Sequence, residues 1–364
     1  MERKSFLQFP RATEGIHLED AYRHRILISV LDEMFIKWGY LPVETPAFDF
    51  FDTYRPLLQG KDLEKVFRLI DRDGDLLMLR SDITLFLAKQ VGIALREEDL
   101  PVRTCYSGVV LRHQNEEDIS NNEFFQVGAE LIGRPGKDGD LEILLLILDT
   151  LKTLDISARI HLGSRAFLDA ATKELKVLER KDFAEAVRSR DRNTMIDVLT
   201  RYKSGTVSQT LTDLFLFIGT PGEYASLLKN PRIDELHNAE KQSLQYLLEL
   251  TDVLTEIEAS PWIRIDLSEI GSQPYYSGIV FQGYMDRIDS AFLSGGRYDE
   301  LMSRFGLSAA SVGFSFFLRK IEPYLGQPER FSLTEKILTA PGTGFLERYR
   351  NAEKMRRSGK KVIL

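Results

Sequence analysis

The chain has 364 residues, a formal net charge of -7, one cysteine and five histidines. Its length suggests about two or three domains, and the acidic balance disfavours a nucleic-acid partner, because tracking phosphates requires a basic surface. Cys105 alone cannot build a disulfide framework, and the scattered histidines show no metal-ligand spacing, so we expect no metal. The longest apolar run, 141–148, is too short to span a bilayer. No basic-then-apolar leader opens the chain, so we expect a cytoplasmic protein without a membrane partner.

The first elements are a helix and a broken strand. Apolar residues recur at helical spacing over 19–38, and Gly39 is well placed to end that helix. The next segment, 41–50, reads LPVETPAFDF and predicts a short strand that its two prolines interrupt.

A hairpin and a second helix follow. The pattern over 66–80 predicts a hairpin with its turn at Asp73-Gly74. A helix is expected over 84–91, and the ordinary role of Ser81 or Asp82 before it is an N-cap, worth about 1 kcal/mol.

Two strand patterns then flank a polar, acidic loop. The first strand is expected over 105–112, and the second, FFQVGAELIG, alternates in a way that places Gln126 and Glu130 on one face. Gly128 lies between them and leaves a gap. Two polar groups on either side of a gap suggest the floor of a small-molecule pocket, and a half-solvated hairpin fits this stretch equally well.

The middle of the chain changes character. Asp140 is expected to cap a buried helix that reaches Thr153, and a strand is predicted over 160–162. Charged helical stretches then dominate 164–260, with one long amphipathic helix expected over 233–258. This block predicts a helical insertion within a β-rich domain, and its charge runs predict solvated faces.

Strand patterns return after the insertion. In the segment AFLSGGRYDEL, Gly295-Gly296 predicts a turn that opens a helix. The remaining predictions are strands over 262–270, 275–284 and 336–340, a strand running into a helix over 311–324, a helix containing KMRR, and the start of a strand at 360–364.

The ordered set of motifs over about residues 10–325 resembles the catalytic core of histidyl-tRNA synthetases. The motifs are LRSDIT, an arginine followed by NEFFQ and a glutamate, PYYSG, and GGRYD followed by VGFSF. The resemblance implies an α+β fold of the class II synthetase type, a mostly antiparallel sheet flanked by helices, with 1–326 as the core and 164–260 as the helical insertion. Residues 327–364 resemble a short remnant of an α/β anticodon-binding domain. A complete domain of that kind needs about 90 or more residues, so we expect no tRNA partner.

The same resemblance implies a histidine pocket. Asp82, one methylene shorter than the family's glutamate, would hold the ammonium group of histidine together with Thr84 and Gln126. Glu130 and Tyr276 would pair with the imidazole, which has one N–H and one lone pair. Leaving such buried groups unpaired costs about 1–3 kcal/mol each, so the pocket would reject ligands without an imidazole. The expected ligand-binding set is completed by Arg112 and Tyr275, with no catalytic residue and no cofactor.

The residues that surround ATP in the synthetases depart from the family pattern. Adenylation needs positive charge around the phosphates, yet the position of the family's arginine before the tyrosine pair is Gly271. The loop after Arg112 replaces a glutamate with Gln114 and continues as Asn115, Glu116, Glu117 and Asp118. Lys320 occupies the position of the adenine-stacking arginine, with Arg319 one residue away, and lysine lacks the planar guanidinium.

A histidine pocket beside a dismantled ATP site is similar to the ATP phosphoribosyltransferase regulatory subunits. That resemblance implies a subunit without catalytic activity of its own. It would assemble with a short catalytic subunit in the first step of histidine biosynthesis, and it would be required for activity and for feedback inhibition by histidine. It further implies a dimer formed through the helix over 19–38. Two alternatives remain: a divergent histidyl-tRNA synthetase, and a paralogue that scaffolds another complex with its pocket retained but unused.

Overall fold

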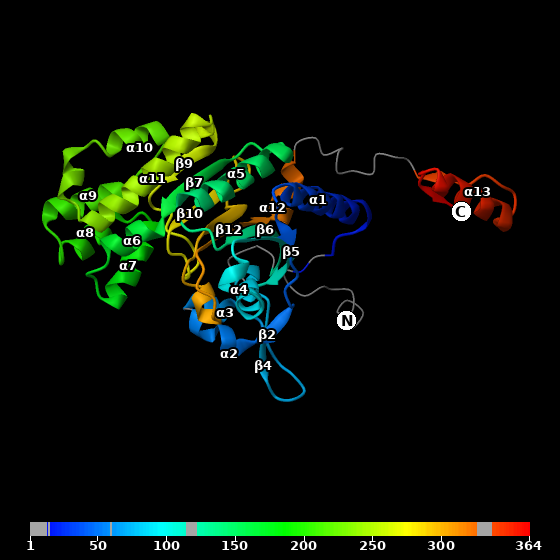
Figure 1. Ribbon diagram of the computed structural model, residues 1–364, viewed down its shortest axis with the longest axis horizontal. Helices are drawn as coiled ribbons and strands as arrows, with labels where there is room; N and C mark the ends of the chain where they lie inside the picture. The colour runs from blue at the N-terminus through cyan, green and yellow to red at the C-terminus, as the bar shows by residue number, and fades with distance from the viewer. Residues whose placement is uncertain (1–12, 14, 59, 114–121, 326–336) are drawn as a thin grey trace, which may run out of the picture.

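The structure is a computed structural model that describes residues 13, 15–58, 60–113, 122–325 and 337–364 (Figure 1). At its centre is a nine-stranded sheet of order β1-β5-β6-β12-β11-β10-β7-β9-β8. From β5 to β7 every neighbouring pair in that order is antiparallel, whereas β1–β5 and β7–β9 are parallel pairs. The mostly antiparallel sheet with its helices confirms the predicted fold class. The strands are β1 (Leu41–Pro42), β5 (Val102–Leu111), β6 (Glu123–Ile132), β7 (Arg159–Ser164), β8 (Ile218–Gly219), β9 (Ile263–Asp266), β10 (Ile279–Tyr284), β11 (Leu293–Arg297) and β12 (Ser311–Phe317).

Helices cover both faces of this sheet. On one face, apolar residues of α1 (Leu18–Lys37) and α5 (Lys137–Thr153) share a core with Val127 and Leu131 of β6. On the other face, α4 (Ile83–Ala94) shares a second core with Ile132. The alternation predicted for β6 is therefore confirmed, because successive side chains enter different cores.

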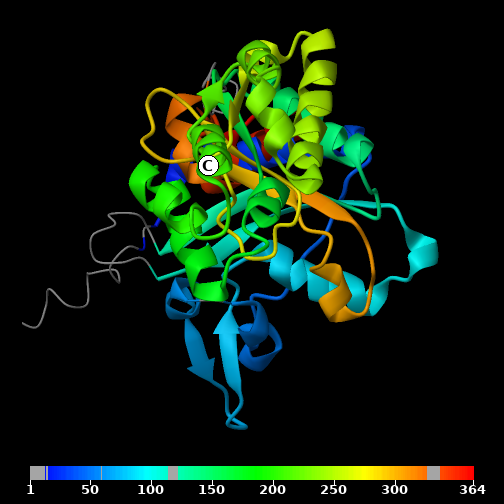
Figure 2. The same cartoon turned by 90° about the vertical axis from the view of Figure 1, so that its left-hand side faces the viewer.

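A small three-stranded sheet projects beyond α4 (Figures 1 and 2). Its order is β2-β4-β3, with β2 (Phe48–Phe50), β3 (Arg68–Ile70) and β4 (Leu76–Leu79). The predicted hairpin is confirmed, and Gly74 takes a φ of 93° in its turn, a conformation that suits glycine. Two short helices, α2 (Phe51–Tyr54) and α3 (Lys61–Lys65), lie between β2 and β3 in the chain.

Between β7 and β9 the chain forms a helical block, shown in green to yellow in Figure 1. The expected single helix over 233–258 is wrong at its start, because a 3-10 turn at Pro231–Glu235 comes first. The Glu240 carboxylate accepts from the His237 N–H (2.9 Å), which fixes the beginning of the last helix in this block. The block also adds β8 to the edge of the central sheet. Its helices are α6 (Arg165–Ala171), α7 (Val177–Arg188), α8 (Arg192–Leu199), α9 (Gly205–Phe215), α10 (Pro221–Leu227) and α11 (Asn238–Glu256).

Two other local predictions are wrong. Asp140 does not cap α5, since the helix begins at Lys137 and the Asp140 carboxylate is buried against the Arg297 guanidinium (2.6 Å). Gly295-Gly296 forms no turn but lies within β11. A Cβ on Gly295 would come within 2.4 Å of the Phe281 ring, so this strand position accommodates only glycine.

The chain beyond β12 continues through α12 (Leu318–Ile321) to a small α/β unit. In that unit β13 (Leu338–Thr339) and β14 (Val362–Ile363) pair in parallel across α13 (Phe345–Arg357), in red in Figure 1. The unit has a small core of its own, in which Ala352 is fully buried. The first part of the predicted tail, 327–336, lies outside the described residues. Of the described helices, none has the length and apolar character needed to cross a bilayer.

Candidate functional site

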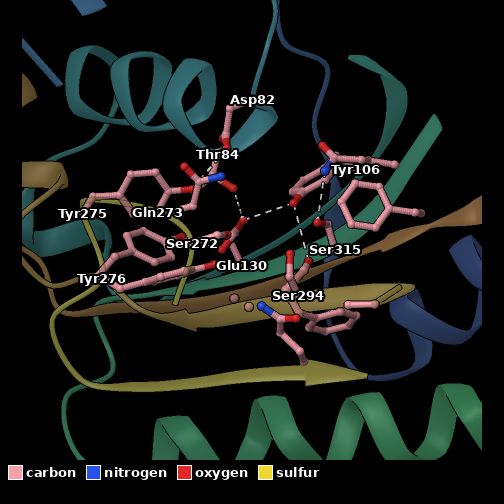
Figure 3. Close-up of a pocket in the computed structure, with 18 of the residues that line it drawn as sticks. Asp82, Thr84, Tyr106, Glu130, Ser272, Gln273, Tyr275, Tyr276, Ser294 and Ser315 are labelled. Atoms are coloured by element: carbon pink, nitrogen blue, oxygen red, sulfur yellow. Dashed lines mark hydrogen bonds between the residues drawn. The ribbon is translucent and has the colours of Figure 1, made fainter. Parts of the chain in front are cut away.

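A cavity of about 140 Å³ lies on the α4 side of the central sheet (Figure 3). Strands β6, β11 and β12 form its floor, the start of α4 closes one side, and the segment before β10 closes another. A space of this size suits a ligand as small as an amino acid. All seven residues predicted to bind a ligand line it: Asp82, Thr84, Arg112, Gln126, Glu130, Tyr275 and Tyr276.

Gln126 and Glu130 lie on the cavity face of β6, as their spacing predicts. The gap expected over Gly128 is filled, because Tyr106 is the cross-strand partner of Gly128 in β5. A Cβ on Gly128 would come within 2.7 Å of the Tyr106 hydroxyl oxygen. The Tyr106 ring therefore separates the two polar groups and adds a phenol to the cavity wall.

Glu130 lies at the floor of the cavity and is almost fully buried, with only 1% of its surface exposed. Its Oε1 accepts hydrogen bonds from the Thr84 hydroxyl (2.7 Å) and the Tyr106 hydroxyl (3.2 Å), and its Oε2 accepts one from the Tyr298 hydroxyl (2.5 Å). Burial raises the pKa of Glu130 to about 7, even though these hydroxyls favour the charged form. A carboxylate has about four acceptor positions, so Glu130 can still accept from a ligand.

The facing strand is shaped to admit this carboxylate. Gly313 of β12 is the cross-strand partner of Glu130, and a Cβ built on Gly313 would lie 1.5 Å from Glu130 Oε2. Any side chain at this position would displace the carboxylate, so the floor of the cavity depends on two strands at once.

The two carboxylate oxygens of Asp82 have different roles: one caps α4 and the other faces the cavity. Oδ1 accepts from the Leu85 N–H (3.0 Å) and caps α4, as the sequence predicts. Oδ2 accepts from the Tyr275 hydroxyl (3.2 Å) and lies 3.5 Å from Arg112 Nη2. The Arg112 Nε–H also donates to the Ser81 carbonyl oxygen (2.5 Å), which fixes the guanidinium at the cavity wall.

The remaining predicted residues differ in their hydrogen bonds within the protein. Gln126 donates from Nε2 to the Ser315 hydroxyl (3.2 Å). The Tyr276 side chain is 9% exposed, and its hydroxyl makes no hydrogen bond to any described residue. Arg112 is the one cation among the described residues that line the cavity. The site thus offers several acceptors, one free phenol and a single positive charge.

Three positions that depart from the synthetase pattern are engaged with other parts of this fold. Gly271 has a φ of 77°, and a Cβ there would lie 2.6 Å from the Tyr276 ring and 3.0 Å from Val280. Lys320 donates to the Ser290 hydroxyl (2.8 Å), and Arg319 lies 3.6 Å from Glu123. The loop residues Gln114, Asn115, Glu116, Glu117 and Asp118 lie outside the described residues.

Sequence reasoning missed several residues of the cavity. Tyr106 carried no local signal, because its place over Gly128 depends on the register between β5 and β6. Tyr298 directly follows Gly295-Gly296-Arg297, and the glycine pair predicts a turn there without indicating a role for the tyrosine. Ser272, Gln273 and Ser315 carried no signal in the sequence, since their place in the site depends on the fold.

Comparison with known proteins places the chain in a family. The family model described as histidyl-tRNA synthetase matches residues 13–321. An ATP phosphoribosyltransferase regulatory subunit from Bacillus pumilus is 30% identical over 92% of this chain and 85% of its own length. A protein of the same description from Moorella thermoacetica is 29% identical over 98% of this chain and 92% of its own.

Solved structures share the fold. A protein from Bacillus halodurans, described as an ATP phosphoribosyltransferase regulatory subunit/histidyl-tRNA synthetase, matches with a TM-score of 0.83 at 24% identity, covering 98% of this chain and 92% of that one. Histidyl-tRNA synthetase from Nostoc sp. PCC 7120 matches with a TM-score of 0.76 at 17% identity, covering 98% and 85%. The chain therefore belongs to the histidyl-tRNA synthetase family and, within it, to the ATP phosphoribosyltransferase regulatory subunits.

Proposed function

We propose that this protein is a histidine-sensing subunit without catalytic activity of its own. It assembles with a short ATP phosphoribosyltransferase catalytic subunit, which it activates, and it transmits feedback inhibition in the first step of histidine biosynthesis. The observation that carries the proposal is the cavity itself, where a deeply buried carboxylate and a free phenol lie opposite acceptors suited to an ammonium group.

Histidine fits the cavity group by group. Its ammonium would bind Asp82 Oδ2, the Gln126 amide oxygen and the Thr84 hydroxyl oxygen. Thr84 gives its proton to Glu130, so its oxygen is left to accept from the ligand. The imidazole N–H would donate to Glu130, and the other ring nitrogen would accept from the Tyr276 hydroxyl. Arg112 is placed to bind the ligand carboxylate, which completes the pairing of a zwitterion.

The same cavity is poorly suited to adenylation. ATP-dependent activation requires several positive groups around the phosphates, and Arg112 is the only cation among the described cavity residues. An arginine at position 271 would collide with Tyr276, and Lys320 already donates to Ser290. These contacts support recognition of histidine without its activation.

Inhibition requires that histidine bind the inhibited assembly more tightly than the active one. Tyr275 is the natural link, because its hydroxyl donates to Asp82 while its segment of chain lies at the cavity rim. We further propose a dimer formed through α1 and an assembly located in the cytoplasm, which a single, buried cysteine favours.

Calorimetry and activity assays on the full chain test the proposal. We expect histidine to bind the purified protein, and we expect it to inhibit phosphoribosyl transfer when the chain is combined with a short catalytic subunit. Histidine-dependent exchange of pyrophosphate into ATP by the chain alone would instead establish a synthetase. Unchanged inhibition after Glu130→Ala would favour a scaffold whose pocket is unused. Absence of histidine binding to both the chain and the complex would refute the sensing role.

A further inference from the structure

A second cavity, of about 580 Å³, lies beside the candidate histidine pocket. Its walls come from three parts of the fold that are distant in sequence. They are α3, which lies between β2 and β3 in the chain, helices α6 and α7 of the helical block (Figure 1), and the segment 272–274. Ser272 and Gln273 line both cavities, so the two spaces share one wall. We refer to this second cavity as the basic cleft.

Positive charge converges on the basic cleft. In a chain of net charge -7, a local excess of this kind needs a cause. Exposed charges along one helix are usually a solvated face, but here the cations come from separate elements and surround a concavity. The charged residues that line it are Lys65, Arg165, Arg180, Lys181 and Arg188 against Asp62 and Glu185.

Much of this charge is not neutralised within the protein. Among the ion pairs of the described residues, none involves Lys65 or Lys181, and the Arg180 Nε atom is buried without a hydrogen-bond partner. Arg188 reaches Glu185 only at 3.8 Å, and that carboxylate is largely exposed. Arg165, by contrast, is paired with Asp169 at 3.1 Å. The Arg180 guanidinium donates from Nη2 to the Lys173 carbonyl oxygen (3.3 Å), which leaves its charge without an acidic partner among the described ion pairs. Together with Lys65 and Lys181 it leaves the cleft with unneutralised positive charge, which favours an anionic ligand.

The chemistry of such a partner follows from the donors. Guanidinium and ammonium groups together favour phosphate oxygens, which accept from both. The cleft is in the size range of small-ligand sites, roughly 300–1,000 Å³. A long nucleic acid would need a basic surface beyond the cleft, and the net charge of -7 disfavours one. We propose that the basic cleft binds a small ligand that carries a pyrophosphate group, of the nucleotide or sugar-pyrophosphate class.

The cleft is physically connected to the histidine pocket. The Arg188 Nη2–H donates to the Gly271 carbonyl oxygen (3.3 Å), and Gly271 packs directly against the Tyr276 ring. An anion that draws Arg188 toward itself changes the support of the segment that carries Tyr275 and Tyr276. Binding at the two sites is therefore coupled and, by linkage, the coupling is reciprocal. This second part of the inference rests on the proposed binding of histidine.

The test uses the full chain and inorganic pyrophosphate, ADP and ribose 5-phosphate as probes, measured by calorimetry at low and at physiological salt. The double variant Arg180→Gln/Lys181→Gln removes two cleft cations. The matched control Lys229→Gln/Arg232→Gln removes the same charge just after α10, from two residues that do not line the cleft. We expect pyrophosphate binding that the cleft variant weakens at least tenfold and the control changes less than twofold, with equal melting temperatures. Stronger binding of ADP or of ribose 5-phosphate then identifies the nucleotide or the sugar class.

The outcomes separate the two proposals. Failure of pyrophosphate and ADP to bind, equal weakening by the control variant, or binding of a short single-stranded RNA in their place would overturn the basic cleft. If the cleft binds its probe and histidine does not bind at all, the cleft stands and the histidine-sensing role fails. With both ligands bound, we expect each to change the affinity for the other by about fivefold or more. Independent binding would overturn the coupling.

Discussion

Among single residues, Glu130 accepts hydrogen bonds from three hydroxyls while it is almost fully buried. The burial of its carboxylate disfavours the charged form, which is the form that would accept from the imidazole of histidine. Replacing Glu130 by Gln keeps the size of the side chain but turns one carboxylate oxygen into an amide N–H₂ group. This group cannot accept a hydrogen bond from the surrounding hydroxyls or from the N–H of an imidazole. We expect histidine affinity to fall about 10- to 100-fold, measured by calorimetry. Glu98→Gln, at a largely exposed carboxylate, serves as control. Equal affinities in wild type and the Glu130 variant would contradict the assigned role.

The raised pKa of Glu130 also predicts a pH dependence of stability. Its pKa is about 7 in the folded protein and 4.5 as the reference, so the folded state binds the proton more tightly than the unfolded state. The stabilisation from this group is fully present below pH 4.5 and is lost as the pH rises through 7, with a magnitude of a few kcal/mol (~1.4 per pKa unit). Without histidine, the melting temperature of wild type should therefore fall relative to that of Glu130→Gln between pH 5 and pH 8.

Glu269, whose pKa is also raised to about 7 by burial, is present in both proteins and cancels in this comparison. A difference in melting temperature that stays constant with pH would show that Glu130 is not the group responsible.

Gly271 has a left-handed backbone conformation and lies against the Tyr276 ring of the cavity wall. Alanine there must adopt a φ of 77° and place its Cβ 2.6 Å from the Tyr276 ring. We expect Gly271→Ala to lower the free energy of unfolding by about 1–3 kcal/mol and to weaken histidine binding. At Gly205, the first residue of α9, an added Cβ meets nothing within 4 Å, so Gly205→Ala should be neutral or slightly stabilising. Urea unfolding of both variants measures the two changes in free energy of unfolding. Equal changes would show that the contact with Tyr276 does not make position 271 special.

At the scale of elements, one buried ion pair joins α5 to β11. Asp140 and Arg297 lie 2.6 Å apart, with side-chain exposures of 0% and 7%. Arg297→Met leaves the Asp140 carboxylate buried with only the Tyr246 hydroxyl as a side-chain partner, so we expect a loss of about 3–5 kcal/mol of stability. The double variant Arg297→Met/Asp140→Leu should lose less than the sum of the single changes, because no charge is stranded. Additive losses in urea unfolding would argue against a coupled pair.

The elements that could be predicted from sequence are those whose signal is local. The hairpin around Gly74 and the alternation of β6 depend on turn chemistry and strand period alone, and both are present. The turn predicted at Gly295-Gly296 is wrong. A glycine pair is typical of a turn, but here the Phe281 ring on the neighbouring strand makes glycine necessary within β11. Asp140 misled for a related reason, since its partner Arg297 is 157 residues away.

The candidate site shows the same division. Asp82, Thr84, Gln126 and Glu130 stand in recognisable motifs, and the structure brings them to one cavity. Tyr106 enters because strand pairing sets it over Gly128, and sequence alone does not specify register between strands. The basic cleft had no signal either, because its cations come from elements that only the folded chain brings together.

At the scale of the whole molecule, the unit over 337–364 has its own parallel strand pair and its own small core. Its recorded contact with the core domain includes the Lys361 ammonium, 3.4 Å from the Tyr22 hydroxyl of α1. We expect a chain ending after Leu325 to keep its histidine affinity within about twofold and its main thermal transition, because surface contacts such as those of Lys361 with Tyr22 contribute little. Loss of the folded core on truncation, seen by circular dichroism, would show that this unit supports the core domain.

The central sheet ends in two very short strands, β1 at one edge and β8 at the other, each of two residues. A strand of that length exposes almost no row of free N–H and C=O groups to another chain. The two outermost strands themselves therefore offer a partner little backbone for strand addition. We therefore expect assemblies formed through the core domain to depend mainly on side chains of its helices and loops, so that surface substitutions can change its partners while the sheet stays intact.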